Sequence, residues 1–359
     1  MQQHSSGVFV LSMGRSGSTL LSRLLQQHPA ICSISEYWTS LFMRGFGDPS
    51  LSGRDYWALL SVPPTWFGPW VEKARAAGEL PAEILYDDAR GRYRLRDCPP
   101  IAAMTLPALD ADPDARVDAL AQMVPNWPTA PVTTHSARLF DLLTTSLHKR
   151  LWVERSGLSY WYVPDLLQGF PDARYVHLHR DGREVVLSMM GMRFFDPVAR
   201  VSWMLNVTPG TRLQKLLFFA KRDLARRLLL RVADLERAIT RQHLRARPYS
   251  LPDRLSPAQR LSAYAHFWAN TSELALEAMA KIPNERLLTL KYEQLVSAPR
   301  AELSRLIEHL LPGEAHAAWL DAVCALPQPQ RARWPDLDPA LAEELQRIIG
   351  PINRALGYA

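Results

Sequence analysis

The chain has 359 residues, of which 47% are hydrophobic and 22% are charged. This composition is typical of a folded globular protein and excludes a largely disordered one. The net charge of +6 at pH 7 suits a protein that handles anions, but the basic residues are too dispersed to indicate nucleic-acid binding. The three cysteines lie far apart without metal-ligand spacing, and no stretch reaches the roughly 20 apolar residues that span a bilayer. We therefore expect a cytoplasmic protein without a disulfide framework or a metal site.

Short apolar runs alternate with helical patterns along the chain. The predicted strands, each a short apolar run, cover residues 8–12, 151–153, 175–178 and 286–290. The predicted helices, each with apolar residues at helical spacing, cover residues 20–28, 160–168, 184–190 and about 299–311. This alternation is typical of an α/β protein with a parallel, P-loop-like sheet flanked by helices.

Two segments, 37–136 and 193–257, break the alternation. The first is rich in Pro, Trp and Asp and shows helical patches without a clear strand, whereas the second is a long amphipathic pattern crowded with Arg. Since no repeat or linker divides the chain, we expect a single domain over residues 1–359, with both segments as largely helical caps over a substrate site. For residues 212–247 we favour a helix that packs on the core or on a second subunit, which leaves a homodimer open, over one lying on an anionic membrane.

Residues 14–19 read Gly-Arg-Ser-Gly-Ser-Thr and lie between the first predicted strand and the first predicted helix. Backbone N–H groups in such a loop, together with the N-terminus of the following helix, favour negative charge at one spot. Arg15 adds a forked cation that suits phosphate or sulfate oxygens. A Walker A loop would carry Lys where Ser18 stands, so the usual equipment for ATP and magnesium is missing. The alternative is an ordinary glycine turn.

The loop and the residues after it resemble the PAPS-dependent sulfotransferases, specifically the bacterial sulfotransferase group and the tyrosylprotein sulfotransferases (PAPS is 3′-phosphoadenosine-5′-phosphosulfate). The matching residues are Arg15-Ser16-Gly17-Ser18-Thr19-Leu20-Leu21, His28-Pro29 and Ser35-Glu36. The resemblance implies that the loop, from Arg15 to Thr19, binds the 5′-phosphosulfate and that Glu36 is the general base. The alternative for Glu36 is a surface carboxylate after a buried strand.

Two later blocks extend the resemblance. Arg180 and Ser188, eight residues apart, match the family's pair for the 3′-phosphate, and Arg180 follows a predicted strand, where open sheets bind ligands. Residues 290–295 are similar to the family's segment near the adenine, which implies that Tyr292 stacks on the base. The alternatives are an ion pair of Arg180 with Asp181 or Glu184, and a bond from Ser188 back to the preceding turn.

The chain departs from the family's pattern at three places. Arg155 stands where the family often has a Lys that stabilises the transition state, and we expect Arg155 to take that part. Met192 stands where the tyrosylprotein enzymes have a further Arg. The Gly-rich 3′ loop of the vertebrate cytosolic enzymes is missing, although Arg331 and Arg333 lie in a loop of similar position.

The resemblance implies transfer of a sulfuryl group from PAPS to an acceptor hydroxyl by in-line displacement, without a metal. Arg15 and Arg155 would stabilise the departing phosphate, and Glu36 would take the hydroxyl proton. Two alternatives stay open, namely a P-loop small-molecule kinase and a non-catalytic nucleotide-binding protein of the same fold.

The sequence does not identify the acceptor beyond a small-molecule, lipid or glycan alcohol. Several aromatic and imidazole side chains are candidates for ligand contacts, with core packing as the alternative. They are Trp38 and Trp268 for the adenine, Trp57, Trp66, Trp70 and Trp127 for the acceptor, and His135. We expect His135 to be structural, together with His177 and His179 on the strand before Arg180.

Overall fold

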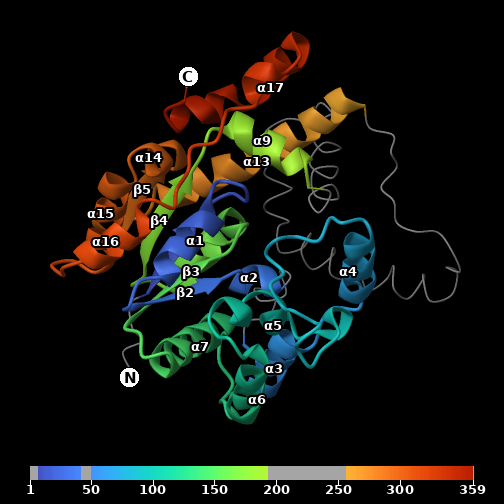
Figure 1. Cartoon of the computed structure of the whole chain (residues 1–359), viewed down its shortest axis with the longest axis vertical. Coiled ribbons are helices and arrows are strands. Elements are labelled where there is room, and N and C mark those ends of the chain that lie inside the picture. Colours follow the sequence, from blue (N-terminus) through green and yellow to red (C-terminus); the bar gives the residue numbers. More distant parts are fainter. Residues whose placement is uncertain (1–6, 42–49, 193–255, 359) are drawn as a thin grey trace, which may run out of the picture.

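The computed structural model describes residues 7–41, 50–192 and 256–358. Its five strands form one parallel sheet in the order β2-β3-β1-β4-β5 (Figure 1). The strands are β1 (Val8–Leu11), β2 (Ile31–Ser35), β3 (Leu151–Arg155), β4 (Arg174–His179) and β5 (Leu287–Lys291). The predicted α/β class is confirmed, with four strands where the apolar runs placed them and β2 as the one that they did not predict.

The predicted helices are confirmed with small shifts of their ends. They correspond to α1 (Ser18–Gln26), α8 (Val163–Gly169), α9 (Gly182–Met190) and α15 (Pro299–Leu310). A 3₁₀ turn, η5 (Ser159–Tyr162), precedes α8. Helix α9 begins two residues earlier than predicted because the Asp181 carboxylate accepts a hydrogen bond from the Arg183 amide and caps the helix there.

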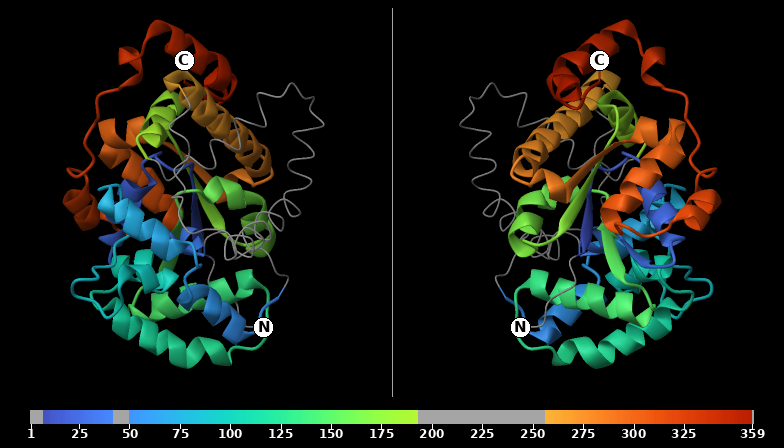
Figure 2. Two further views of the ribbon diagram at one scale, coloured as in Figure 1. Left: turned by 90° about the vertical axis from the view of Figure 1, so that its right-hand side faces the viewer. Right: turned by 90° about the vertical axis from the view of Figure 1, so that its left-hand side faces the viewer.

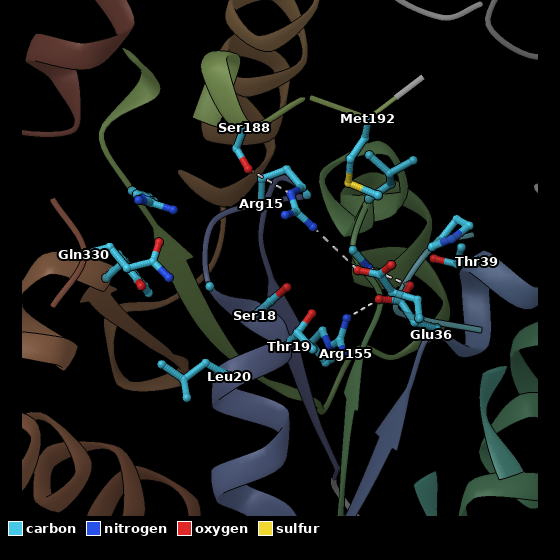
Figure 3. A pocket seen from close by; sticks show the side chains of 18 of the residues that line it. Arg15, Ser18, Thr19, Leu20, Glu36, Thr39, Arg155, Ser188, Met192 and Gln330 are labelled. Atoms are coloured by element: carbon cyan, nitrogen blue, oxygen red, sulfur yellow. Dashed lines mark hydrogen bonds and ion pairs between the residues drawn. The ribbon is translucent and has the colours of Figure 1, made fainter. Parts of the chain in front are cut away.

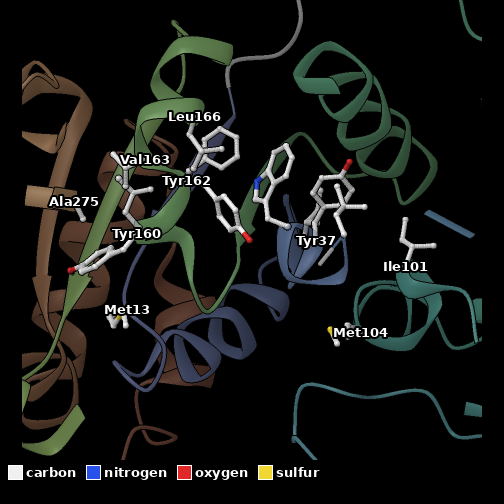
Figure 4. Packing of buried hydrophobic residues seen from close by; sticks show 14 of the residues in the cluster. Met13, Tyr37, Ile101, Met104, Tyr160, Tyr162, Val163, Leu166 and Ala275 are labelled. Atoms are coloured by element: carbon white, nitrogen blue, oxygen red, sulfur yellow. The ribbon is translucent and has the colours of Figure 1, made fainter. Parts of the chain in front are cut away.

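Helices cover both faces of the sheet (Figure 2). Alternate residues of β1 point to opposite faces, so that Val8 and Val10 belong to one buried cluster and Phe9 and Leu11 to the other. The first cluster is closed by α1, α14 (Tyr292–Ser297), α15 and α16 (Ala317–Val323). The second is closed by α8, α9, α13 (Pro257–Met279) and α17 (Pro339–Ala355). Figure 4 shows part of this second cluster, in which Tyr160, Val163 and Leu166 pack beside Ala275.

The segment from residue 50 to residue 136 is largely helical and lies beside the β2 edge of the sheet (Figure 1). Its helices are α3 (Gly53–Ser61), α4 (Phe67–Ala76), α5 (Pro100–Met104), α6 (Pro113–Met123) and the start of α7 (Val132–Ser146). Helix α7 packs on β2 and β3, where Phe140 lies 5.0 Å from Trp152 between ring centroids. We call the part from α3 to α6 the cap.

Residues 193–255, which include almost all of the second predicted cap and the Arg-rich stretch 212–247, lie outside the described residues. Within the ranges that are described, no helix combines the length and apolar character that crossing a membrane requires.

Candidate active site

A cavity of about 560 Å³ lies at the carboxyl-terminal edge of the sheet. Every strand leads into it, and its wall includes Arg15 after β1, Glu36 after β2, Arg155 at the end of β3, Arg180 after β4 and Tyr292 after β5. The carboxyl ends of parallel strands meet at one edge, which is why residues so far apart in the sequence come together. Figure 3 shows Arg15 between Gln330 and Leu20 on one side and Glu36, Thr39 and Met192 on the other.

The loop after β1 is shaped by glycine at a position that no other residue fits. Gly17 has φ +91°, and a Cβ on it would lie 2.2 Å from the ring of Tyr292. Helix α1 starts at Ser18, so its first-turn amides have no partner within the helix and lie beside the cavity wall formed by Ser18 and Thr19. Ser16 is buried, and the cavity is lined by its neighbours on either side instead.

Arg15 connects the two parts of the predicted nucleotide site. Its Nε donates a hydrogen bond of 3.0 Å to the hydroxyl of Ser188, 173 residues further along the chain. Ser188 therefore has this partner instead of a carbonyl of the preceding turn. The Arg15 backbone is left-handed, with φ +74°, a conformation that costs a residue with a side chain on the order of 1–3 kcal/mol.

Glu36 is buried, with 2% of its surface exposed, so its interpretation as a surface carboxylate is wrong. Its Oε1 accepts a hydrogen bond from Arg155 Nη1, and its Oε2 accepts one of 3.0 Å from the Gly157 amide. Glu36 is also left-handed, with φ +56°, and directly precedes α2 (Tyr37–Ser40). Backbone strain at both Arg15 and Glu36 is typical of functional sites, where surrounding contacts hold a side chain in one orientation.

Arg155 is the direct partner of Glu36. Its side chain is 3% exposed, and its second terminal nitrogen donates a hydrogen bond of 2.5 Å to the Ser35 hydroxyl. It lines the cavity where the resemblance implies a transition-state cation, and it also holds the carboxylate of the predicted base in place.

Glu154 is a buried carboxyl that the sequence reasoning missed. Burial raises its pKa to about 8, and the Ser156 hydroxyl donates a 2.6 Å hydrogen bond to its Oε1. The Ser156 oxygen in turn accepts a 2.9 Å bond from the Trp38 amide at the start of α2. Glu154 thus supports the helix that follows Glu36. The available signal was a Glu directly after the apolar run 151–153.

Arg180 lies over the Tyr292 ring, 4.5 Å from its centroid, and forms a 3.7 Å ion pair with Glu184. The ion pair that was the alternative role of Arg180 is therefore present, although Arg180 still lines the cavity. The Glu184 Oε1 also accepts backbone bonds from Arg333 (2.5 Å) and Trp334 (3.0 Å). The Glu184 carboxylate therefore connects α9 to the segment that contains Arg331 and Arg333. Both of these arginines line the cavity.

Hydrogen bonds to α14 and α17 hold the junction between β4 and α9 in place. Asn353, on α17, accepts a 2.8 Å bond from the Gly182 amide and donates one of 3.1 Å to Asp181. Glu293 accepts bonds from the Asp181 amide (3.1 Å) and from the Tyr358 hydroxyl (2.7 Å). Arg180 therefore lies at a junction whose backbone is held by hydrogen bonds to segments later in the chain.

Most of the other candidate side chains are structural. Trp38 and Trp268, at 1% and 2% exposure, are core residues and do not line the cavity, so their alternative role in core packing holds and their candidate role at the adenine does not. His135 stacks against Tyr56 and Trp127, and its Nε2 is bonded to the Leu51 carbonyl. His177 shares a 2.6 Å bond with Tyr160, and burial lowers its pKa to about 3 and that of His179 to about 4.

The cap contributes Trp70, Pro81, Glu83 and Met104 to the wall, and the lining also includes Leu158, Met192, Leu326, Gln328 and Gln330. Of the four Trp residues considered for the acceptor, Trp70 lines the cavity and Trp57, Trp66 and Trp127 do not. Glu83 was missed because it lies in a connection without a motif. Among residues 7–41, 50–192 and 256–358, no group of three or more His, Cys, Asp or Glu side chains could hold a metal ion.

A model of the sulfotransferase family matches residues 7–222, which is more than half of the chain. The chain belongs to the sulfotransferase family. The resemblance seen in the sequence motifs is thereby confirmed, and family and fold together support sulfotransferase activity. No curated protein sequence matches this sulfotransferase.

Solved sulfotransferase structures are similar to this chain over nearly all of its length. The sulfotransferase domain from the Synechococcus PCC 7002 olefin synthase is 18% identical, with a TM-score of 0.48, covering 100% of this chain and 97% of that one. The sulfotransferase domain from the curacin biosynthetic pathway is 16% identical, with a TM-score of 0.48 and 99% coverage of both chains. Sulfotransferase STF9 from Mycobacterium avium is 17% identical, with a TM-score of 0.46, covering 99% of this chain and 78% of that one.

Proposed function

We propose that this sulfotransferase moves a sulfuryl group from PAPS to an acceptor hydroxyl, with Glu36 as the general base. One observation carries the proposal: the ends of all five strands deliver anion-binding and proton-accepting groups to one cavity. The cavity wall combines a glycine loop, a helix N-terminus and arginines, which is the chemistry that a phosphosulfate and a second phosphate require.

The donor would be held by two groups of residues. Arg15, Gly17, Ser18 and Thr19 would bind the 5′-phosphosulfate, with Ser16 supporting the loop from behind. Arg180 and Ser188 would bind the 3′-phosphate, and Tyr292 would contact the adenine. The hydrogen bond between Arg15 and Ser188 supports this division, because the two groups that it joins lie within reach of one bisphosphorylated nucleotide.

Glu36 is suited to accept the proton of the acceptor hydroxyl. Each carboxylate oxygen has two lone-pair sites, and Arg155 and Gly157 each use one, which leaves room for a further hydrogen bond. When bound, PAPS supplies the sulfuryl group: the acceptor oxygen forms the new bond to sulfur as the bond between sulfur and the 5′-phosphate oxygen breaks. Arg15 and Arg155, with the loop amides, would stabilise the charge that collects on the leaving phosphate.

Two other functions make different predictions for the same cavity. A small-molecule kinase would need a cation at the position of Ser18, and in the described part of the chain arginine is the one basic residue type in the cavity lining. A non-catalytic nucleotide-binding protein would bind the donor and release it unchanged.

Calorimetric titration and mass spectrometry test the proposal together. We expect tight binding of PAPS and of its product, adenosine 3′,5′-bisphosphate (PAP), and weak binding of ATP with magnesium. We also expect that a metabolite pool incubated with enzyme and PAPS contains molecules heavier by one SO₃ unit. Preference for ATP would favour the kinase, and binding without any such mass gain would favour the non-catalytic protein.

A further inference from the structure

The two sides of the cavity differ in charge: one is lined by arginines, and the other by two carboxylates, Glu36 and Glu83, with Arg155 paired to Glu36. The lining contains Arg180, which follows β4, and Arg331 and Arg333, which follow Gln330 on the opposite side of Arg15 from Glu36 (Figure 3 labels Gln330, Arg15 and Glu36). The carboxylates in the lining are Glu36, which Figure 3 places on the other side, and Glu83, which comes from the cap. The cap residues that accompany Glu83 are apolar, namely Trp70, Pro81 and Met104. An acceptor held on this side therefore meets an apolar wall and carboxylates.

The two carboxylates are compensated to very different degrees. Glu36 is directly bonded to Arg155 inside the protein. Glu83 has its ion pair with Arg15 at 3.9 Å, beyond hydrogen-bond distance, and its side chain is 21% exposed. Elsewhere on the cap, Asp88 and Asp118 each receive two hydrogen bonds of 2.6–2.9 Å from one arginine.

The partner of Glu83 has another task. Arg15 is oriented by its 3.0 Å bond to Ser188 and belongs to the loop that the proposed function assigns to the phosphosulfate. A guanidinium that binds this anion neutralises less of a carboxylate 3.9 Å away, since the anion and the carboxylate share one positive charge. Glu83 then has uncompensated negative charge beside the space left for the acceptor. An acceptor with a cationic group compensates the negative charge of Glu83, whereas an acceptor with an anionic group is repelled by it.

We propose that the acceptor is an apolar alcohol or phenol that also carries an ammonium group, and that Glu83 binds this group. The inference rests on the proposed function, because it needs Arg15 to be engaged by the donor. Trp70, Pro81 and Met104 contact the apolar body of the acceptor, and an aromatic side chain such as Trp70 also attracts cations. Glu83 is thus a specificity-determining residue on the cap, separate from the base on the sheet.

Three phenols of similar size test the inference: tyramine with an ammonium group, 4-ethylphenol without charge, and 3-(4-hydroxyphenyl)propionate with a carboxylate. Binding to the PAP-loaded protein is measured by calorimetry, and kcat/KM is measured with PAPS. The wild type is expected to prefer tyramine over 4-ethylphenol by about tenfold, the effect of one partly desolvated ion pair, and to bind the carboxylate least. Glu83→Gln should lose this preference, and Glu83→Asp should keep part of it.

Glu72→Gln is the matched control, because it removes a carboxylate of the same cap that pairs with Arg96 outside the cavity, and it should keep the wild-type preference. Equal binding of the three phenols by wild type, binding of none of them, or an unchanged preference in Glu83→Gln overturns the inference. Each of these results leaves the proposed function standing as long as the wild type binds PAP. Failure of the wild type to bind PAP and PAPS contradicts the proposed function itself.

Discussion

The two sides of the cavity differ in how their residues are held. On the sheet side, Glu36 follows β2 directly and is bonded to Arg155 at the end of β3, and Arg15, in the loop after β1, is bonded to Ser188 on α9. On the cap side, Trp70, Pro81 and Met104 come from helices and connections without a strand and meet the cavity mainly through apolar surface. The difference supports the proposal that residues held by the sheet carry the chemistry and that the cap contacts the acceptor.

The largest effect is expected from Glu154→Gln, which changes the free energy of unfolding by replacing a buried carboxyl on the sheet side. The folded-state pKa of Glu154 is raised from 4.5 to about 8, so between these values the unfolded chain is ionised while the folded protein holds the proton. The penalty on folding is absent below pH 4.5, grows as the pH rises, and levels off above about pH 8. Gln mimics the protonated acid, so the variant should match wild type near pH 4.5 and be more stable at pH 8.5 by on the order of a few kcal/mol. Urea unfolding at several pH values measures this difference, and a difference that does not vary with pH would contradict it.

Glu36→Gln should lower turnover while leaving PAP affinity nearly unchanged. Loss of the general base is expected to reduce turnover by at least about 10²-fold. PAP affinity should stay close to wild type, because the proposed phosphate contacts come from other residues. Steady-state kinetics and calorimetry measure the two quantities. Near wild-type turnover would show that Glu36 is not the general base, and Glu83 would then be the next candidate.

Gly17→Ala probes the loop after β1, with Gly78→Ala as its control. Both glycines are left-handed, at φ +91° and +68°, so both substitutions carry a backbone cost of about 1–2 kcal/mol. A Cβ on Gly17 would also meet the Tyr292 ring at 2.2 Å, whereas nothing lies within 4 Å of one on Gly78. PAP affinity should therefore fall by about tenfold or more in Gly17→Ala and stay unchanged in Gly78→Ala. Equal affinities in the two variants would show that the loop does not shape the nucleotide site.

Trp70→Ala should give the smallest effect and report on the cap side. Removing the ring takes away apolar contact with the acceptor, so KM for the acceptor should rise several-fold while PAP affinity stays constant. Exposed Trp66, on the same cap but outside the cavity, supplies the control variant Trp66→Ala. If Trp70→Ala instead weakened PAP binding, the division of the cavity into a donor side and an acceptor side would be wrong.

The same comparison explains what the sequence could reveal. The loop after β1 was predictable from the residues themselves, because glycines between a strand and a helix are a local pattern, whereas Arg180 after β4 and Tyr292 after β5 were predicted from the family resemblance; a parallel sheet brings these strand ends together. Strand β2 was considered only as the buried strand before Glu36 and is not among the strands predicted from apolar runs, because two of its five residues are serines, although all five are buried. Ser33 lies in the interior because its hydroxyl is bonded to Ser22 on α1, a contact that no local pattern reveals.

The rest of the site depends on contacts between distant segments. Glu184 was weighed as a partner of Arg180, but its bonds to the backbone of Arg333 and Trp334 depend on how the 331–334 segment crosses α9. Glu83 reaches the cavity because the connection after α4 lies against the loop after β1. Neither position carries a motif, and neither comes directly after a strand.

The bond between Gly182 and Asn353 has a consequence for the order in which the protein matures. Asn353 leaves the ribosome 171 residues after Gly182, long after the strand that leads to Arg180 has been made. Until the 331–334 segment and α17 have been made, both the cavity wall beside Arg180 and the second buried cluster are incomplete. Because α17 also closes the second buried cluster, we expect a chain that stops before α17 to lose stability as well as the brace at Gly182, and therefore to bind PAP weakly.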